Sequence, residues 1–542
     1  MLDLQDLDPR QFEYFVITIQ NIYQVIGLTE VSEGGKQTLE SRQFSYGGGI
    51  KECGSFSATF WENDLVLFWH CQVEFQEPIS AVKIVLPPIP EGAVIGFKEK
   101  RVLTEGEIFD SAVTPGEFNR LQALLVEYPD ASALFIDLFE APPRKKPLIV
   151  EKKDGQLKLS IILEELAYQW NSEFKSPIFS FQKVQNWQEA ARKICASVEK
   201  DFKVVPFEER TDLPSWAKQI SLVVNLDGMG YFHEQNHNFV QATERLNELS
   251  ERFPPEKTLV CMAGFMGRFD HSSASFDPAE ELGGEEAFRE FMRVAHRLGF
   301  HIMILGNVHG IGSELVEKYP NLLREAQQCL ASGQIYGFCY DWKGCVTPEW
   351  VIHYISPDDA RWRKILIHGI GSLVEKYDID GYFLDQSHQC PNDPNHDHYR
   401  GICALIGELR SRYPKVLVAG ESMKDYLLPL TPFATEHPPL PPLDSYHPFM
   451  DYIFNRYVRR FMHLVIYSPD NKWGAYPFGV CVKPVSVEND KSVPEEKIRD
   501  WKYDARCFNH GIIPTLMLSN WTVDLKSGAA GEIFEFARTY SR

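Results

Sequence analysis

The sequence has no apolar run long enough to cross a lipid bilayer, so we expect no membrane span. Its first residues, MLDLQDLDPRQFEYF, contain neither a basic n-region nor an apolar h-region, and we therefore expect no secretory signal and a cytoplasmic protein. Basic residues are outnumbered by acidic ones, 55 against 75, for a formal net charge of −20. That balance argues against a nucleic-acid partner and against binding to anionic membranes, and it suits a neutral or cationic substrate.

The 11 cysteines are odd in number and scattered, and they include no CxxC pair. We therefore expect free thiols and no structural zinc site. No Gly-rich phosphate loop follows the first strand of the second half, which counts against an open nucleotide-binding sheet. Nothing in the sequence implies a cofactor, and we assign no metal site.

The chain does contain two halves with different hydrophobic rhythms. Up to about residue 180 it consists of short segments with alternating apolar and polar residues, such as LVLFWHCQVEF, separated by Gly, Pro and Asn. This pattern predicts an N-terminal β-sandwich over residues 1–184. A helix over 186–202, with Asn186 as its N-cap, opens a helical linker that we place at 185–215.

From residue 216 to 542 apolar strands alternate with amphipathic helices. The strands are predicted at 220–226, 257–265, 300–307, 379–384, 415–420, 432–435, 463–468 and 511–518, and the clearest helices at 239–253, 284–299, 358–377 and 397–413. Eight such strands predict an α/β fold, a (β/α)8 TIM barrel. A doubly wound open sheet is the main rival.

In a barrel of this kind the chemistry lies at the C-terminal ends of the strands. Polar residues follow the first five predicted strands, and we take them as candidate site residues: Asp227, Arg268, Asn307, His309, Asp385, Gln386, His388 and Glu421. Each has a structural alternative. Asp385 and Glu421 could cap the helices that follow them, and Asn307 and His309 could bind loop backbone.

Other polar residues fit a structural role better. Asp380 precedes its strand, far from the predicted mouth, and we expect it in a turn. The loop QCPNDPNHDHYR is rich in His and Asp and could be imagined as a metal site with His388, but its Pro and Asn content favours capping of the next helix by Asn395 or Asp397.

Asp385 and Glu421 should stand on adjacent strands, because one helix and one strand separate them. Two carboxyl groups that flank a glycosidic bond, held roughly 5–5.5 Å apart, give a retaining double displacement. The nucleophile must stay ionised, while the acid must hold a proton at rest. An Asp is short and suits attack, and a Glu is long enough to reach the departing oxygen.

The segments GGEEAFREFMRVAHRLGFHIMI, DIDGYFLDQ and VLVAGES resemble the catalytic barrel of retaining α-glycosidases, over about residues 215–540. That group contains the α-amylase superfamily, the α-galactosidase families and the endo-α-N-acetylgalactosaminidases. The resemblance implies Asp385 as the nucleophile and Glu421 as the acid/base. GNVHG is similar to the Asn-His pair of amylases, which implies that Asn307 and His309 lie beside the sugar.

The chain departs from these families at several points. Amylases carry an Arg two residues before the nucleophile, where this chain has Phe383. The galactosidase families place an Asp acid/base near the sixth strand, so Glu436 or Asp451 could take that role in place of Glu421, and Glu436 is included among the candidate substrate-binding residues.

The sequence therefore predicts a glycoside hydrolase that cleaves α-linked sugars with retention and acts on an oligo- or polysaccharide. A non-catalytic carbohydrate-binding protein on a degenerate barrel is the first alternative. A metal-dependent hydrolase that uses the His-rich loop is the second. The sugar, the linkage, endo or exo action and a homo-oligomeric state stay open.

Overall fold

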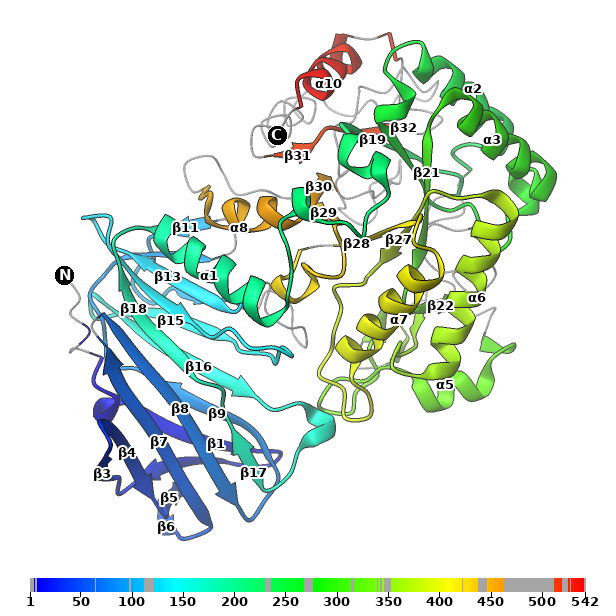
Figure 1. Cartoon of the computed structure of the whole chain (residues 1–542). Coiled ribbons are helices and arrows are strands. Elements are labelled where there is room, and N and C mark those ends of the chain that lie inside the picture. Colours follow the sequence, from blue (N-terminus) through cyan, green and yellow to red (C-terminus); the bar gives the residue numbers. More distant parts are fainter. Residues whose placement is uncertain are drawn as a thin grey trace.

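The structure is a computed structural model that describes residues 4, 7–63, 65–96, 99–111, 121–229, 235–267, 276–312, 316–338, 340–341, 344–345, 352–421, 423–436, 446–462, 511–518, 525–526 and 528–540. The chain forms two bodies, one built mainly of antiparallel sheets and one built of alternating strands and helices (Figure 1).

Two antiparallel sheets make up the N-terminal body. The first sheet has the order β12 (Ile108–Asp110), β15 (Leu148–Lys153), β16 (Gln156–Glu164), β9 (Ile79–Val85), β1 (Glu13–Thr18), β2 (Ile22–Ile26), β5 (Gln43–Tyr46), β6 (Gly49–Lys51). The second has the order β11 (Glu99–Arg101), β10 (Ala93–Gly96), β13 (Ala123–Glu127), β14 (Ala133–Asp137), β18 (Phe179–Val184), β8 (Val66–Phe75), β7 (Gly54–Asn63), β4 (Lys36–Ser41), β3 (Thr29–Glu33), and β17 (Glu173–Lys175) pairs with β8.

The alternation read in the sequence sets the buried face of these strands. In β8 the side chains from Leu67 to Phe75 are buried at every second position. The rings of Tyr14 on β1 and Trp69 on β8 are parallel, with centroids 6.2 Å apart, although the two strands belong to different sheets. Both sheets thus contribute to one hydrophobic core.

A helical layer joins the two bodies. The helix α1 (Trp187–Asp201) begins after the predicted cap, Asn186, whose side chain accepts the backbone N–H of Glu189. It packs with α8 (Phe449–Tyr457) in a hydrophobic cluster that also contains residues of β13 and β14. Tyr457 on α8 donates its hydroxyl to the carbonyl of Cys195 at 3.2 Å.

The C-terminal body contains a parallel sheet whose pairing fits a barrel. Its order is β31 (Ile512–Ile513), β30 (Arg459–Met462), β29 (Phe433–Glu436), β28 (Leu417–Gly420), β27 (Gly381–Asp385), β21 (His301–Asn307), β20 (Thr258–Met262), β19 (Leu222–Leu226), β32 (Thr515–Leu518). β31 pairs with β30 at one end of this order, and β32 pairs with β19 at the other end. Only Pro514 separates β31 from β32, so the two together are one strand segment that pairs with both ends of the sheet. Counted in this way, the sheet has eight strands in the described part of the chain.

Four helices alternate with these strands as predicted: α2 (Phe239–Ser250), α3 (Gly284–Leu298), α6 (Ala360–Tyr377) and α7 (His398–Arg412). A further helix, α10 (Gly528–Thr539), was not predicted. A short helix, α5 (Pro320–Ala326), and the small strands β22 (Gly310–Gly312), β23 (Gly337–Phe338), β24 (Tyr340–Asp341), β25 (Gly344–Cys345) and β26 (Ile352–Tyr354) lie in the long insertion after β21. No helix in the described ranges is long and apolar enough to cross a membrane.

The seventh strand of the sheet begins before the predicted run 463–468. It is described over Arg459–Met462, and the predicted run itself lies outside the described residues. A search for apolar runs misses this strand because Arg459 and Arg460 have charged side chains, although both are buried.

Two apolar clusters lie on opposite sides of the parallel sheet, one on its inner side and one on its outer side. Val223, Cys261 and Leu305 lie in one cluster with Phe383 and Phe433. Their neighbours in the chain, such as Val224, Met262 and Leu384, belong to the cluster that contains the helices α2, α3, α6 and α7. Since side chains alternate along a strand, the first set marks the interior of the barrel.

Candidate active site

Polar side chains replace the apolar ones where the interior reaches the C-terminal ends of the strands. Asp227, Asn307, Asp385 and Glu421 continue the alternation of the interior residues on their four strands. All four are buried, with exposed fractions of 0%, 0%, 3% and 6%. The fold thus brings four of the predicted site residues to one end of the barrel.

Asp385 and Glu421 lie on neighbouring strands at the same height, because Leu384 on β27 pairs with Gly420 on β28. One peptide unit links them directly. The backbone N–H of Gln386, the residue after Asp385, donates to Oε2 of Glu421 at 2.7 Å. His388 Nδ1 lies 3.3 Å from the same oxygen, so the site contains two carboxyl groups and one imidazole. A donor to a carboxylate favours its charged form.

Gln386 has an unusual backbone, with φ at +60° in the left-handed region that non-glycine residues rarely occupy. Its side-chain Oε1 accepts the Nδ2 of Asn307 at 2.7 Å, and its N–H faces Glu421. Strained backbone of this kind persists where the surroundings over-determine it, and such positions cluster at functional sites.

Asn307 and His309 have well-defined structural contacts. Asn307 Oδ1 accepts the backbone N–H groups of His309 and Gly310, both at 2.8 Å. His309 Nδ1 lies 2.6 Å from Nε2 of Gln328. Burial lowers the pKa of His309 to about 3, with help from His398 and His388, so its ring is neutral. Asn307 thus holds loop backbone and His309 meets the side chain of Gln328, and a contact with sugar stays a prediction.

Asp227 extends the site to the first strand. Its Oδ2 accepts the amide of Asn225 at 2.8 Å, and its backbone carbonyl lies 3.2 Å from Nδ1 of His237. Burial raises the pKa of the Cys261 thiol, and the charges of Asp227 and Asp385 raise it further. The two carboxylates therefore act on one buried thiol in the barrel interior.

A glycine allows the first two strand ends to approach. Gly264 has φ at +66°, and a Cβ there would lie 1.9 Å from the carbonyl oxygen of Met229. Any larger residue would push apart the segments that follow Asp227 and Ala263.

Glu436 and Asp451 lie on the other side of the sheet. Glu436 shares the outward alternation of Ala434, which packs against α8. Arg460 donates to Oε2 of Glu436 at 3.0 Å and to Oδ1 of Asp451 at 2.6 Å. Burial alone would lower the pKa of Arg460, but the two carboxylates raise it above its usual value. In the structure Glu436 and Asp451 therefore share Arg460, and the place of Glu436 at the substrate stays a prediction.

The His-rich loop supports the helix after it. Asp397 is the N-cap of α7, as predicted, and accepts the N–H of Arg400 at 2.9 Å. Asp393 is buried. His396 and His398 lower its pKa against the effect of burial. No group of three or more His, Cys, Asp or Glu side chains that could hold a metal ion occurs among the described residues. Arg268 lies outside them.

Sequence reasoning missed Asn225, Gln328 and Ser387, whose hydroxyl accepts the N–H of Glu421 at 3.0 Å. Asn225 did carry a signal, since it is the one polar residue in the buried strand LVVNL and shares the face of Asp227. Gln328 carried none, because it lies in the long insertion and meets His309 only in the folded protein.

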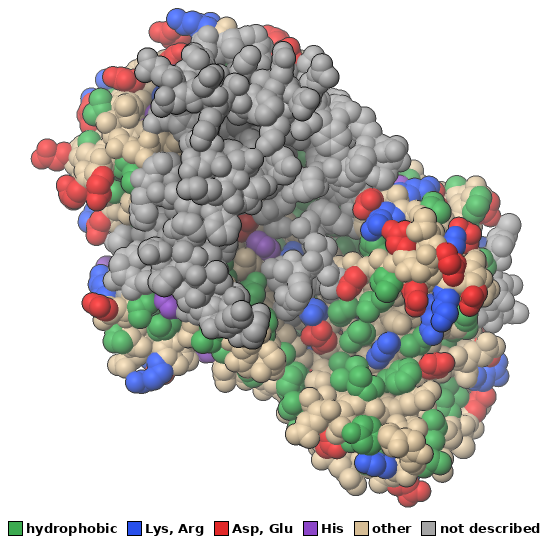
Figure 2. Space-filling model, turned by 180° about the vertical axis from the view of Figure 1, so that it is seen from behind, with side chains coloured by type: hydrophobic (Ala, Val, Ile, Leu, Met, Phe, Trp, Pro, Cys, Tyr) green, Lys and Arg blue, Asp and Glu red, His purple; other side chains and the backbone are tan. Residues whose placement is uncertain are grey.

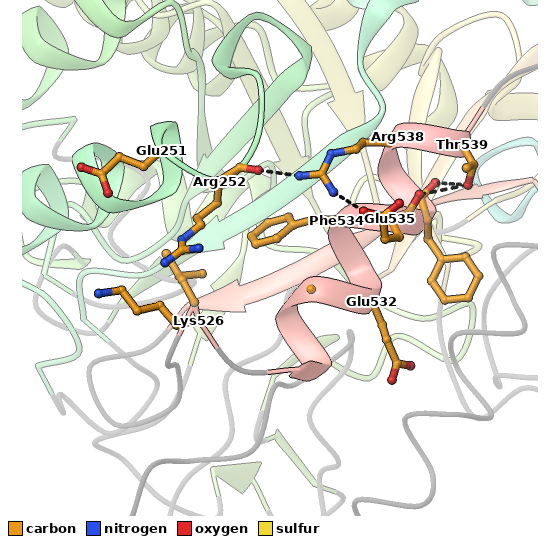
Figure 3. A pocket seen from close by; sticks show the side chains of 11 residues that line it. Glu251, Arg252, Lys526, Glu532, Phe534, Glu535, Arg538 and Thr539 are labelled. Atoms are coloured by element: carbon orange, nitrogen blue, oxygen red, sulfur yellow. Dashed lines mark hydrogen bonds and ion pairs between the residues drawn. The ribbon is translucent and has the colours of Figure 1, made fainter.

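A hollow of about 720 Å³ lies elsewhere, on the outer wall of the barrel (Figure 3). It is lined by α10 and by Glu251 and Arg252, which follow α2. Arg538 bridges from Glu535 to the carbonyl of Arg252. Because neither Asp385 nor Glu421 lines it, we do not connect it with the candidate active site.

The described residues on the face drawn in Figure 2 form no extended patch of one charge. Figure 2 views the molecule from behind and shows acidic and basic side chains interspersed over both bodies. The face drawn there therefore offers no broad basic surface to a polyanion.

Solved α-glycosidases share this fold. The alpha-N-acetylgalactosaminidase NagBb from Bifidobacterium bifidum, as its Gal-NHAc-DNJ complex, has a TM-score of 0.70 and 11% identity, over 97% of this chain and 88% of that one. The galactosidase domain of the alpha-galactosidase-sucrose kinase AgaSK has a TM-score of 0.54 and 15% identity, over 97% and 71%. The GH36 alpha-galactosidase AgaA from Geobacillus stearothermophilus has a TM-score of 0.52 and 11% identity, over 97% and 75%.

No protein-family model and no curated protein matches the sequence. At these identities the likeness concerns the fold. The resemblance read from the sequence motifs and the likeness of the structures therefore agree on one point: this chain has an α-glycosidase-type fold.

Proposed function

We propose that this protein is a glycoside hydrolase that cleaves α-linked sugars with retention of configuration. The observation that carries the proposal is the pairing of Asp385 with Glu421 at the mouth of the barrel, where one peptide N–H connects the end of β27 to the Glu421 carboxylate. Two carboxyl groups on adjacent strands are the machinery that glycoside cleavage needs. The solved structures with this fold include an alpha-N-acetylgalactosaminidase and alpha-galactosidases, so α-galactosides and α-N-acetylgalactosaminides are the substrates to test first.

In this mechanism the carboxylate of Asp385 attacks the anomeric carbon while Glu421 gives a proton to the departing oxygen. A covalent glycosyl ester forms on Asp385. Glu421 then takes a proton from water, which attacks the same carbon and releases the sugar in its original anomeric form. Asp385 suits the attacking role because it is the last residue of a buried strand and its backbone is held in the sheet. His388 lies against Glu421 and is placed to influence its proton.

Product stereochemistry tests the proposal directly. With a nitrophenyl α-galactoside or α-N-acetylgalactosaminide, proton NMR should show the α-anomer as the first sugar released. Asp385→Gly should be inactive, and added azide should restore release of nitrophenol with formation of the β-glycosyl azide, because azide enters from the side of the missing nucleophile. A β-anomer as first product, or the same turnover in Asp385→Gly as in the unchanged protein, contradicts the proposal.

A non-catalytic sugar-binding protein is the second candidate. It is favoured by the backbone N–H that Gln386 donates to Oε2 of Glu421, because a donor at this oxygen favours the charged carboxylate over the protonated form that the acid role requires. Isothermal titration with the same glycosides separates the two candidates. Saturable binding with no released sugar after prolonged incubation supports the second one.

A further inference from the structure

The loop that follows Asp385 carries the contacts of the candidate site. We call residues 386–397 the site loop. It contains Gln386 and His388, which meet Glu421, and Tyr426 donates its hydroxyl to the carbonyl of His388 at 3.1 Å. The position of this loop therefore decides how the donors face Glu421.

The middle of the site loop is held by the N-terminal body. Asn392 is 5% exposed, and its Oδ1 accepts the backbone N–H of Ala167 at 2.7 Å. Its Nδ2 donates to the carbonyl of Glu165 at 2.9 Å. The amide thus pairs with an N–H and a C=O two residues apart, as a neighbouring strand would. In Figure 1 the turn after β16 reaches the loop that follows β27.

The segment that receives Asn392 is itself fixed. The N–H of Glu165 donates to the carbonyl of Ser80 at 2.8 Å, and its carboxylate accepts Nη1 of Arg144 at 2.9 Å. Leu166, between the two backbone partners of Asn392, packs against the apolar cluster of the barrel. The N-terminal sheets therefore offer a rigid partner.

A second tie runs from the same turn to the end of the site loop. Tyr168 donates its hydroxyl to Oδ2 of Asp397 at 2.7 Å, and Asp397 caps α7. Next to Asn392, Asp393 accepts the backbone N–H of Cys329 at 2.9 Å, which ties the loop to the insertion after β21. The loop is thus held at its beginning by the site, and at its middle and end by other parts of the chain.

We propose that Asn392 is a positioning residue and that the N-terminal sheets serve the active site by holding the site loop through it. This inference rests on the proposed function, since it concerns the placement of groups around Glu421. Asn392 acts through the loop: its amide fixes the segment four residues beyond His388 and six beyond Gln386, whose N–H faces the carboxylate. An Ala at this position leaves the backbone N–H of Ala167 without this acceptor and leaves the carbonyl of Glu165 with the indole N–H of Trp170, so the loop loses its hold at this point.

The test compares Asn392→Ala and Tyr168→Phe with Tyr457→Phe in the full chain. Tyr457→Phe is a matched control, because it also removes a hydroxyl that bridges distant parts of the chain, from α8 to Cys195 on α1, away from the site loop. We expect Asn392→Ala to lower kcat about 10- to 100-fold, since small displacements of catalytic groups have effects of this size. KM should stay within about twofold. Tyr168→Phe should show a smaller loss of kcat of the same kind, and Tyr457→Phe none.

Hydrogen exchange, measured by mass spectrometry, gives a readout that does not depend on activity. Peptides that cover residues 386–397 should exchange faster in Asn392→Ala, while those that cover α1 should not. Unchanged exchange in the site loop overturns the inference even if the enzyme is active. Unchanged kcat in both loop variants also overturns it, whereas absence of hydrolysis in the unchanged protein overturns the proposed function instead.

Discussion

Two aspartates at opposite ends of one strand show how the environment assigns a role. Asp380 precedes β27 and Asp385 ends it. At the lower end, Asp380 Oδ2 accepts the N–H of Ile302 at 2.8 Å and lies 3.1 Å from Nε2 of His296, while His301 is 3.5 Å from its other oxygen. At the upper end, Asp385 faces the polar interior beside Glu421.

The comparison teaches that burial and charge alone do not identify a catalytic carboxylate. Burial disfavours the charged form of Asp380, but hydrogen bonds from His296, His301 and the backbone lower its pKa. The protein itself therefore supplies hydrogen-bond partners for this carboxylate. Such a carboxylate stabilises the fold. Asp385 stands at the C-terminal end of the strand, where barrel enzymes carry their chemistry, and there we propose a catalytic role for the same residue type.

The largest expected effect comes from replacing Asp385, at the C-terminal end of β27. Asp385→Asn should lower kcat/KM on a confirmed α-glycoside by more than about 10⁴-fold, because the amide cannot form the glycosyl ester. The free energy of unfolding should change little. Steady-state kinetics and urea denaturation measure the two quantities. Asp380→Asn serves as the matched control, and an equal loss of activity in both variants would contradict the assignment.

The second-largest effect is expected from replacing Asp380, which precedes β27. Asp380→Asn should lower the free energy of unfolding by about 1–3 kcal/mol, because it removes charge-assisted bonds to Ile302 and His296. Its kcat should match that of the unchanged protein at temperatures where both are folded. Urea denaturation at pH 6 checks the first value. A stable variant with lost activity would reverse the roles that we assign to the two ends.

The smallest effect concerns the pH dependence of the stability that the pair of His296 and Asp380 contributes. The bond to Asp380 raises the pKa of His296, so its contribution to stability is present below its unfolded pKa, about 6.5, and is lost as pH rises through the folded value. Asp380 has a lowered pKa, so its own contribution is lost only at strongly acidic pH. The stability difference between the unchanged protein and His296→Gln should be about 1 kcal/mol or less, since His296 is partly exposed. It should be largest between about pH 4 and 6.5.

Denaturation curves from pH 5 to 9 give this difference directly. A difference that grows above pH 7 would show that the ion pair between His296 and Asp380 is not its source.

Much of the barrel could be predicted from local pattern. The runs at 220–226, 257–265, 300–307 and 415–420 all contain strands, because an apolar run bounded by polar residues buries both of its faces in a parallel sheet. The stripes of α2, α3, α6 and α7 were readable for the same reason, since a helix must bury one side. The placement of Asp385 and Glu421 at strand ends followed from these boundaries.

The face on which a strand-end residue lies could not be predicted in the same way. Phe433 and Ala434 are both apolar and both buried, so the segment FATE does not show which of its sides is the interior. Only the packing of Ala434 against α8 decides that Glu436 points outward, to Arg460.

By itself the sequence determined where most strands and helices of the barrel form and which acids end the strands, because those properties depend on periodicity over a few residues. Tertiary structure alone decided which acids share a space, and it joined Asn392 to a turn that lies 225 residues away in the chain. The physical reason is that such bonds form only after two separate bodies have packed, and no local pattern encodes the geometry of that contact.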